Sequence, residues 1–160
     1  MTRSPDASDA DDRFPDVAGG RRASFVIVAM LEDLALLADA LQAFMARRIP
    51  EEHRQAIELA IVEAVTNVIR HGYPDGEQGV AEVYYSEQDN GVRVEIRDRG
   101  RPIPPDKLEQ ADGSVFAFDP DDIANLPEGG MGLSLIKQLF DTVYYESRDG
   151  INRLILEKNC

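Results

Sequence analysis

Two pairs of short alternating segments, each joined by a tight turn, constrain the fold of this chain more than any other feature. The first pair, VAEVYYSE and GVRVEIRD, covers residues 80–87 and 91–98 and is joined through an Asn-Gly pair. The second pair, TVYYESR and INRLILEK, covers residues 142–148 and 151–158 and is joined by an Asp-Gly pair. Alternating apolar residues on both sides of such turns are typical of β-hairpins. Because a hairpin pairs its strands antiparallel, the sheet should be largely antiparallel.

Helical patterns are interleaved with these hairpins. Residues 31–48 repeat leucine and alanine at three- and four-residue spacing, residues 51–72 keep a stripe of small and branched apolar side chains, and a third pattern covers 131–140. Ahead of them, ASFVIVAM at residues 23–30 is typical of a strand. The order strand, helix, helix, hairpin, loop, helix, hairpin predicts a two-layer α/β (α+β) sandwich, in which helices cover one face of a mixed, mostly antiparallel sheet.

The boundaries of the folded part follow from composition. Residues 1–19 are rich in Asp, Ser, Pro and Ala, which predicts a disordered acidic tail before a folded domain over residues 20–160. Between the first hairpin and the last helix, residues 100–130 lack a clear pattern, and a connection of roughly 30 residues is long for a compact domain. We expect it to form a lid at about 101–129 or a disordered insertion.

Charge and cysteine content narrow the function class. The chain has 17 basic and 30 acidic residues, a formal net charge of −13, which argues against a nucleic-acid binder and leaves basic protein partners open. The single cysteine, Cys160, excludes a disulfide framework within the chain. The N-terminus lacks the apolar core of a secretory signal, and no apolar run approaches the ~20 residues of a membrane span. We therefore expect a cytoplasmic protein without membrane contacts.

The first candidate site lies in EAVTNVIRHGYPDG, residues 63–76. Glu63 and Asn67 differ by four residues, so they lie on neighbouring turns at the border of the apolar stripe, where they can face a cleft. Taken alone, the pair also fits a solvated helix flank. On the same helical wheel, His71 turns toward the apolar stripe, where a hydrogen-bonded histidine near the helix C-terminus is the expected role.

Two further candidates are an aspartate at a strand end and a glycine-rich helix start. Asp98 opens the run DRGRP, where it can accept a hydrogen bond from an exocyclic amine or satisfy turn amides, while Gly100 lets a ring approach the backbone. GGMGL, residues 129–133, precedes the last helix, so its backbone N–H groups can bind phosphate, although ordinary loop flexibility explains it equally well. It is neither a Rossmann fingerprint nor a Walker A loop.

In sequence order, an E-x-x-x-N helix, a D-x-G strand end, a long connection and a G-G-x-G helix start resemble the N, G1 and G2 boxes of the Bergerat-fold ATPase superfamily, to which gyrase, histidine kinases and MutL belong. The resemblance runs from about Arg22 to Lys158. Within the superfamily, the forms EAVTNVIRHGYP, DRGRP and GGMGLSLI are similar to those of bacterial anti-sigma factor serine/threonine kinases. The implied fold is the Bergerat ATP-binding sandwich.

The resemblance also implies a role for each matching residue. Glu63 would be the general base, Asn67 would hold Mg²⁺ against the triphosphate, and Asp98 would bind the adenine amino group with Gly100 beside the base. Phosphate contacts would come from Gly130, Met131, Gly132 and Leu133. A carboxylate can accept a proton and an amide oxygen suits a hard cation, so these assignments agree with the residue chemistry.

The function implied by this resemblance is that of a Mg-ATP-dependent serine/threonine protein kinase that also works as a partner switch. Such a protein phosphorylates a STAS-type antagonist in one state and sequesters a sigma factor in the other. The alternative is a sequestration module that binds ATP without phosphotransfer. A homodimer fits the resemblance too, although the residues give no independent sign of it. Two departures, Pro102 in place of a second G1 glycine and Ile103 in place of an aromatic residue, concern the lid.

Overall fold

The computed structural model describes residues 20–45, 47–110 and 131–160, and the statements below concern these ranges. The acidic tail expected over residues 1–19 and most of the lid expected over about 101–129 lie outside the described residues.

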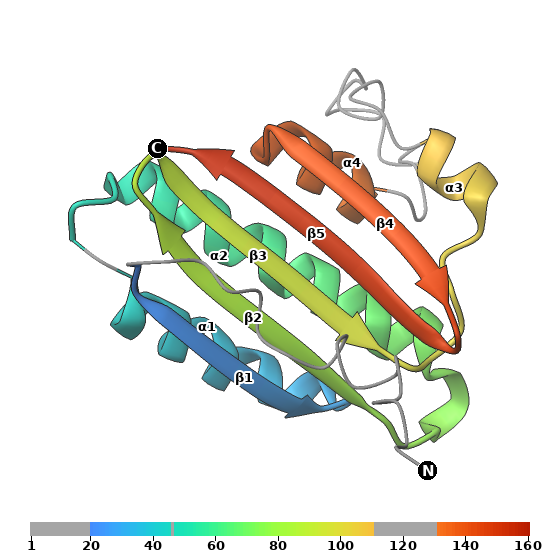
Figure 1. Ribbon diagram of the computed structural model, residues 1–160. Helices are drawn as coiled ribbons and strands as arrows, with labels where there is room; N and C mark the ends of the chain where they lie inside the picture. The colour runs from blue at the N-terminus through green and yellow to red at the C-terminus, as the bar shows by residue number, and fades with distance from the viewer. Residues whose placement is uncertain (1–19, 46, 111–130) are drawn as a thin grey trace, which may run out of the picture.

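The centre of the protein is a five-stranded sheet in the order β1-β2-β3-β5-β4 (Figure 1). Each neighbouring pair in this order is antiparallel, so the antiparallel α/β arrangement expected from the two hairpins is confirmed. Asp149 and Gly150 both have positive φ in the second hairpin, as a tight turn of this kind requires. The strands are β1 Arg22–Val28, β2 Val80–Gln88, β3 Gly91–Asp98, β4 Thr142–Arg148 and β5 Ile151–Asn159.

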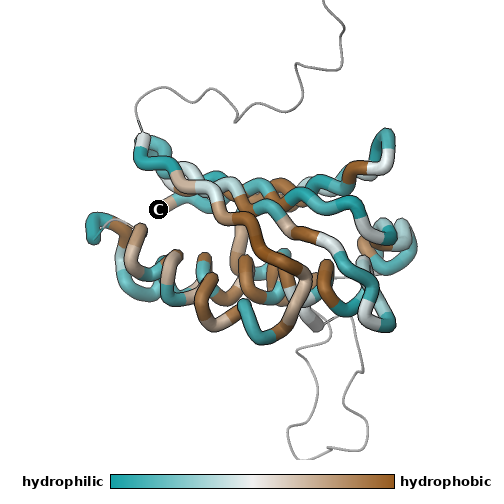
Figure 2. The backbone as a smooth tube through the Cα atoms, turned by 90° about the horizontal axis from the view of Figure 1, so that it is seen from below, coloured by the Kyte–Doolittle hydropathy of each residue, from teal (hydrophilic) through white to brown (hydrophobic). Residues whose placement is uncertain are grey.

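The helices lie together against one face of the sheet, which gives two layers (Figures 1 and 2). They are α1 Leu34–Phe44 after a short 3₁₀ turn η1 Leu31–Asp33, then α2 Glu51–Asn67 and α4 Met131–Leu139. The expectation of one helix to Arg48 was wrong: α1 ends at Phe44, because the chain turns at Met45 to bury Met45 and Ile49.

A second difference concerns the section expected to be irregular, where α3 Pro105–Gln110 forms one short helix. Proline suits the first turn of a helix, and Asp106 in the same turn interacts favourably with the free N–H groups there, so the local sequence PDKLEQ accounts for it.

The hydrophobic core fills the space between the two layers. From α2 it takes Ile57 and Ile61, and from the sheet Val94 and Leu156, all fully buried. Burying a side chain of this size stabilises the fold by roughly 1.5–3 kcal/mol relative to exposure. The central position of α2, packed against β3, α1 and α4, makes this helix the fixed support for any site on its edge.

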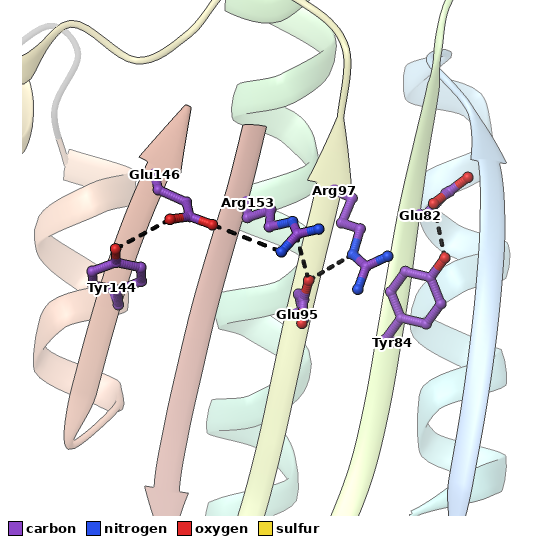
Figure 3. Close-up of polar contacts among 7 residues, drawn as sticks. All are labelled: Glu82, Tyr84, Glu95, Arg97, Tyr144, Glu146 and Arg153. Atoms are coloured by element: carbon purple, nitrogen blue, oxygen red, sulfur yellow. Dashed lines mark hydrogen bonds and ion pairs between the residues drawn. The ribbon is translucent and has the colours of Figure 1, made fainter. Parts of the chain in front are cut away.

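The opposite face of the sheet carries a polar layer (Figure 3). Arg97 Nε donates to Glu95 Oε1 at 2.6 Å, Arg153 lies 3.8 Å from the same oxygen, and its other end is 3.7 Å from Glu146. The Arg97 guanidinium also stacks over the ring of Tyr84. These charges neutralise one another across four strands, so this face is a structural layer, and the chemistry has to be sought between the sheet and the helices.

Candidate functional site

A cavity of about 310 Å³ opens between the sheet and the helix layer. It lies where the C-terminal half of α2, the end of β3 and the start of α4 meet, with β4, β5 and the segment after β3 closing the other sides. Asn67 and Asp98 line this one cavity together with Leu133. Segments widely separated in the sequence therefore converge here.

Glu63, Asn67 and Gly132 form one contact at the edge of the cavity. Glu63 and Asn67 are both half-buried on α2, at the border of the apolar stripe where the helical wheel placed them. A Cβ atom added to Gly132 would lie 3.0 Å from Glu63 Oε2 and 3.3 Å from Asn67 Nδ2. A side chain at position 132 would therefore press on the ends of the Glu63 and Asn67 side chains, which would have to shift by a few tenths of an ångström.

Asp98, at the end of β3, is held by two hydrogen bonds to a single oxygen. Its Oδ1 accepts from the Gly100 N–H and from Asn152 Nδ2, each at 2.8 Å. Burial raises the pKa of this carboxyl above its ordinary value, and the two hydrogen bonds act in the opposite direction. A buried carboxylate with one oxygen already bonded is suited to accept a hydrogen bond from a ligand amine on the other.

The chain after Asp98 is fixed by a contact between two glycines. Past Asn67, α2 continues as a single π turn, η2 Val68–Gly72, and the carbonyl of Gly72 accepts from the Arg101 N–H at 2.9 Å. A Cβ on Gly100 would lie 2.6 Å from that carbonyl oxygen. The small size of Gly100 thus allows this backbone contact, and Gly100 lies between Asp98 and Arg101, which line the cavity; the approach of a ring to Gly100 stays a prediction.

The next residues are fastened to the sheet and to α4. The Ile103 N–H donates to the Tyr145 hydroxyl at 2.8 Å, and Lys137 Nζ donates to the Leu108 carbonyl at 2.5 Å. Burial raises the pKa of Tyr145, so its hydroxyl stays neutral at physiological pH. Pro102 and Ile103, the two departures from the motif, thus form a fixed part of the cavity wall.

Three exposed basic residues are among those that line the cavity: His71, Arg101 and Lys107. His71 is exposed, and it lines the cavity together with Ala64 and Val68 of the apolar stripe toward which the helical wheel turned it. It lies within the π turn that ends the helix. Arg101 also lies 3.4 Å from Glu77 on the surface.

The structure brings some of the predicted site residues together, while others lie partly or wholly outside the described residues. Asn67, Asp98 and Leu133 share the cavity, and Glu63 and Gly132 adjoin Asn67. Gly130 lies outside the described residues; Met131 is described as the first residue of α4 by its backbone alone. Sequence reasoning missed Asn152 and Tyr145, two polar residues on the helix-facing side of the sheet.

The polar groups at the edge of the cavity are chemically compatible with a magnesium-bound triphosphate. Within the described ranges no cluster of three or more His, Cys, Asp or Glu side chains could hold a metal by itself. Mg²⁺ bound with a nucleotide takes few protein ligands, since phosphate oxygens and water complete its octahedron. An amide at position 67 beside the glycine cradle of α4 fits such a cation.

Comparison with known proteins agrees with this geometry. Residues 27–158 match the family described as histidine kinase-like ATPase domain, and the chain belongs to this family. The superfamily resemblance noted from the three motifs is thereby confirmed.

Two individual proteins are similar to this chain in sequence. The chain is 31% identical over 100 residues to the serine-protein kinase RsbW of Oceanobacillus iheyensis, a match that covers 62% of each protein. It is 34% identical over 94 residues to the serine-protein kinase RsbW of Staphylococcus aureus, covering 56% of this chain and 57% of that protein. The match thus spans less than two thirds of the length of these curated relatives.

A solved structure is similar in fold. The crystal structure of the RsbU and RsbW domains of Rv1364c from Mycobacterium tuberculosis superposes with a TM-score of 0.59 at 18% identity. The superposition covers 86% of this chain and 32% of that one, and at this identity it supports the fold alone. In the described part of the chain no helix is both long and apolar enough to cross a membrane.

Proposed function

We propose that this protein is a Mg-ATP-dependent serine/threonine protein kinase and anti-sigma regulatory factor. The observation that carries the proposal is the convergence of Asn67 and Asp98 on one cavity, with Gly132 set against Glu63 and Asn67 at its edge. The similarity to proteins named serine-protein kinase supports a kinase over other members of the ATPase family.

The binding roles follow from the position of each group. The free oxygen of Asp98 accepts from the exocyclic amine of adenine, while Leu133 and the apolar wall pack against the base. At the other end, Asn67 would offer its amide oxygen to Mg²⁺, and the first N–H groups of α4 around Gly132 would bind the phosphates, since a helix N-terminus favours an anion. When bound, Mg²⁺ neutralises phosphate charge and orients the terminal phosphoryl group.

The catalytic role falls to Glu63. Its carboxylate takes the proton of the acceptor serine hydroxyl as the serine oxygen forms a bond to the γ-phosphorus. The bond from that phosphorus to the β,γ-bridging oxygen breaks, so the products are ADP and a phosphoserine. Arg101 and Lys107 line the cavity and are the candidate cations to neutralise the negative charge that develops on the transferred phosphoryl group.

The proposed substrate is a small STAS-type antagonist, and the proposed sequestered partner is a sigma factor in the cytoplasm. Both partners are proteins, which agrees with a net charge of −13 that disfavours nucleic acid. A homodimer of this chain is part of the same proposal.

If Glu63 is the general base, the variant Glu63→Gln should lose phosphotransfer activity but keep its affinity for ATP. The variant should lose about 10²–10⁴-fold in phosphotransfer, the usual contribution of a general base, because the amide cannot accept the serine proton. Its affinity for ATP should stay within about twofold of the parent, because glutamine keeps the size of the side chain. Transfer of label from ATP to the antagonist, and ATP titration by calorimetry, measure the two quantities.

The matched control is Glu52→Gln, at the exposed N-terminus of the same helix, which should leave both quantities unchanged. Full transfer by Glu63→Gln would reject the assigned base. If the parent protein binds ATP and the sigma factor but transfers no phosphate to any antagonist, the chain is a sequestration module instead.

A further inference from the structure

Three polar residues form a row across the sheet beside the cavity. Asp98 of β3 pairs directly with Asn152 of β5, and Asn152 pairs in turn with Ser147 of β4. In the next row inward, Ile96, Leu154 and Tyr145 point to the same side, toward the helices. The row therefore ends the apolar face of the sheet with hydrogen-bonding groups.

Asn152 is almost completely buried, at 2% exposure, and both ends of its amide are engaged. Nδ2 donates to Asp98 Oδ1 at 2.8 Å and to the Gly100 carbonyl at 2.9 Å, while Oδ1 accepts from the Ser147 hydroxyl at 2.7 Å. The reverse orientation of the amide would place its oxygen against two acceptors. The partners thus fix which end of the amide faces Asp98.

This bond decides which carboxylate oxygen a ligand can use. With donors from Gly100 and Asn152, both lone pairs of Asp98 Oδ1 are occupied. An amine in the cavity would then donate its hydrogen bond to Oδ2. The second bond of Asn152, to the Gly100 carbonyl, holds the turn that supplies the other donor.

We propose that Asn152, oriented by Ser147, is a positioning residue for recognition of the exocyclic amine of the nucleotide base, through its bond to Asp98. The inference rests on the proposed function, since it names the residue that makes the same cavity selective for an amino-bearing purine. Asn152 itself acts through the carboxylate and contacts no reacting atom.

The test compares two nucleotides in five proteins: the parent, three single variants and one double variant. Affinities for ATP and for purine riboside triphosphate, which lacks the 6-amino group, are measured with Mg²⁺ by calorimetry. The parent should prefer ATP by about tenfold or more, as a hydrogen bond to a charged group predicts. In Asn152→Leu the preference should fall to within about threefold of unity, because the carboxylate is no longer held. Ser147→Ala, at an exposed position that tolerates the change, should give an intermediate preference.

Asp98→Asn supplies the reference, and adding Asn152→Leu to it should leave the nucleotide preference unchanged, because both act through one bond. A merely structural asparagine would weaken both nucleotides equally in Asn152→Leu and Ser147→Ala, and that result overturns the inference. An unchanged ATP preference in both variants overturns it too. If the parent binds neither nucleotide, the proposed function fails; if the parent prefers ATP and the variants keep that preference, this inference alone fails.

Discussion

Asp98 is a residue at which stability and ligand recognition are opposed. Burial raises the pKa of its carboxyl above the ordinary value, so the folded protein holds this proton more tightly than the unfolded chain. Stability from this group is therefore largest when it is protonated. It declines as the pH rises from the ordinary pKa of an aspartate through the raised value in the fold.

Replacing this aspartate by asparagine should stabilise the unliganded protein at neutral pH. The amide keeps an oxygen that can accept from Gly100 and Asn152, and it removes the buried charge. The melting temperature of Asp98→Asn should exceed that of the parent near pH 7. The difference should shrink as the pH is lowered through the pKa of Asp98, where the parent becomes neutral as well.

Thermal melts of both proteins without nucleotide, from about pH 7 to about pH 4, measure this difference. A variant less stable than the parent at neutral pH would contradict it, as would a gain that stays constant across the range.

Single residues with a chemical signature could be found from the sequence, whereas their supports could not. Glu63, Asn67 and Asp98 stand in motifs whose spacing points to a common site, and each lies at or beside the cavity. Asn152 was missed because its partner is 54 residues away in the chain. The one available signal was its place two residues before Leu154, which puts a polar side chain on the core face of a strand.

At the scale of elements, the π turn at the end of α2 meets the turn after β3 through two glycines that are not equivalent. A Cβ on Gly100 would clash with the backbone of Gly72, at 2.6 Å from its oxygen. A Cβ on Gly72 would find its nearest neighbour, Asp98 Oδ1, at 3.6 Å, an ordinary contact. Backbone cannot rotate away as a flexible side chain can, so the two positions should respond differently to the same substitution.

Gly100→Ala should cost about 1–3 kcal/mol of unfolding free energy, as overpacking of a tight contact does, and should weaken ATP binding by moving Asp98. Gly72→Ala should change stability by less than about 1 kcal/mol in either direction. Urea unfolding with a common slope for both variants measures this asymmetry. An equal loss of unfolding free energy in the two variants would contradict the prediction that the backbone contact at Gly100 is the tighter one.

The order and type of most elements followed from local pattern, since hairpin turns and apolar periodicity act over short stretches. The π turn did not, because it depends on how α2 meets the chain after β3, where Gly72 binds Arg101. The end of α1 was placed too late for the same reason: burial of Ile49 in the hydrophobic core, a tertiary event, overrides a favourable helix pattern.

For the whole molecule, the site brings together segments that lie far apart in the chain. α2 lies early in the chain, β3 in the middle, and α4 near the end, and each supplies part of one cavity wall. A ligand bound by all three would add a further connection between them. Because it binds the folded state alone, it should raise the stability of the entire domain.

Saturating Mg-ATP should therefore raise the melting temperature. At a hundred times the dissociation constant the stabilisation is about 2.7 kcal/mol, roughly 5–10 °C for a domain of this size. Removal of Mg²⁺ with a chelator should shrink the rise, and in Asn67→Ala the rise should be small with or without the cation, because the amide ligand is gone. Glu146→Gln, on the polar face of the sheet away from the cavity, should behave like the parent.

If saturating ATP leaves the melting temperature of the parent protein unchanged, the protein is a scaffold that binds no nucleotide. If the melting temperature of Asn67→Ala rises as much, and depends on Mg²⁺ as strongly, as that of the parent, then residues other than Asn67 bind the cation.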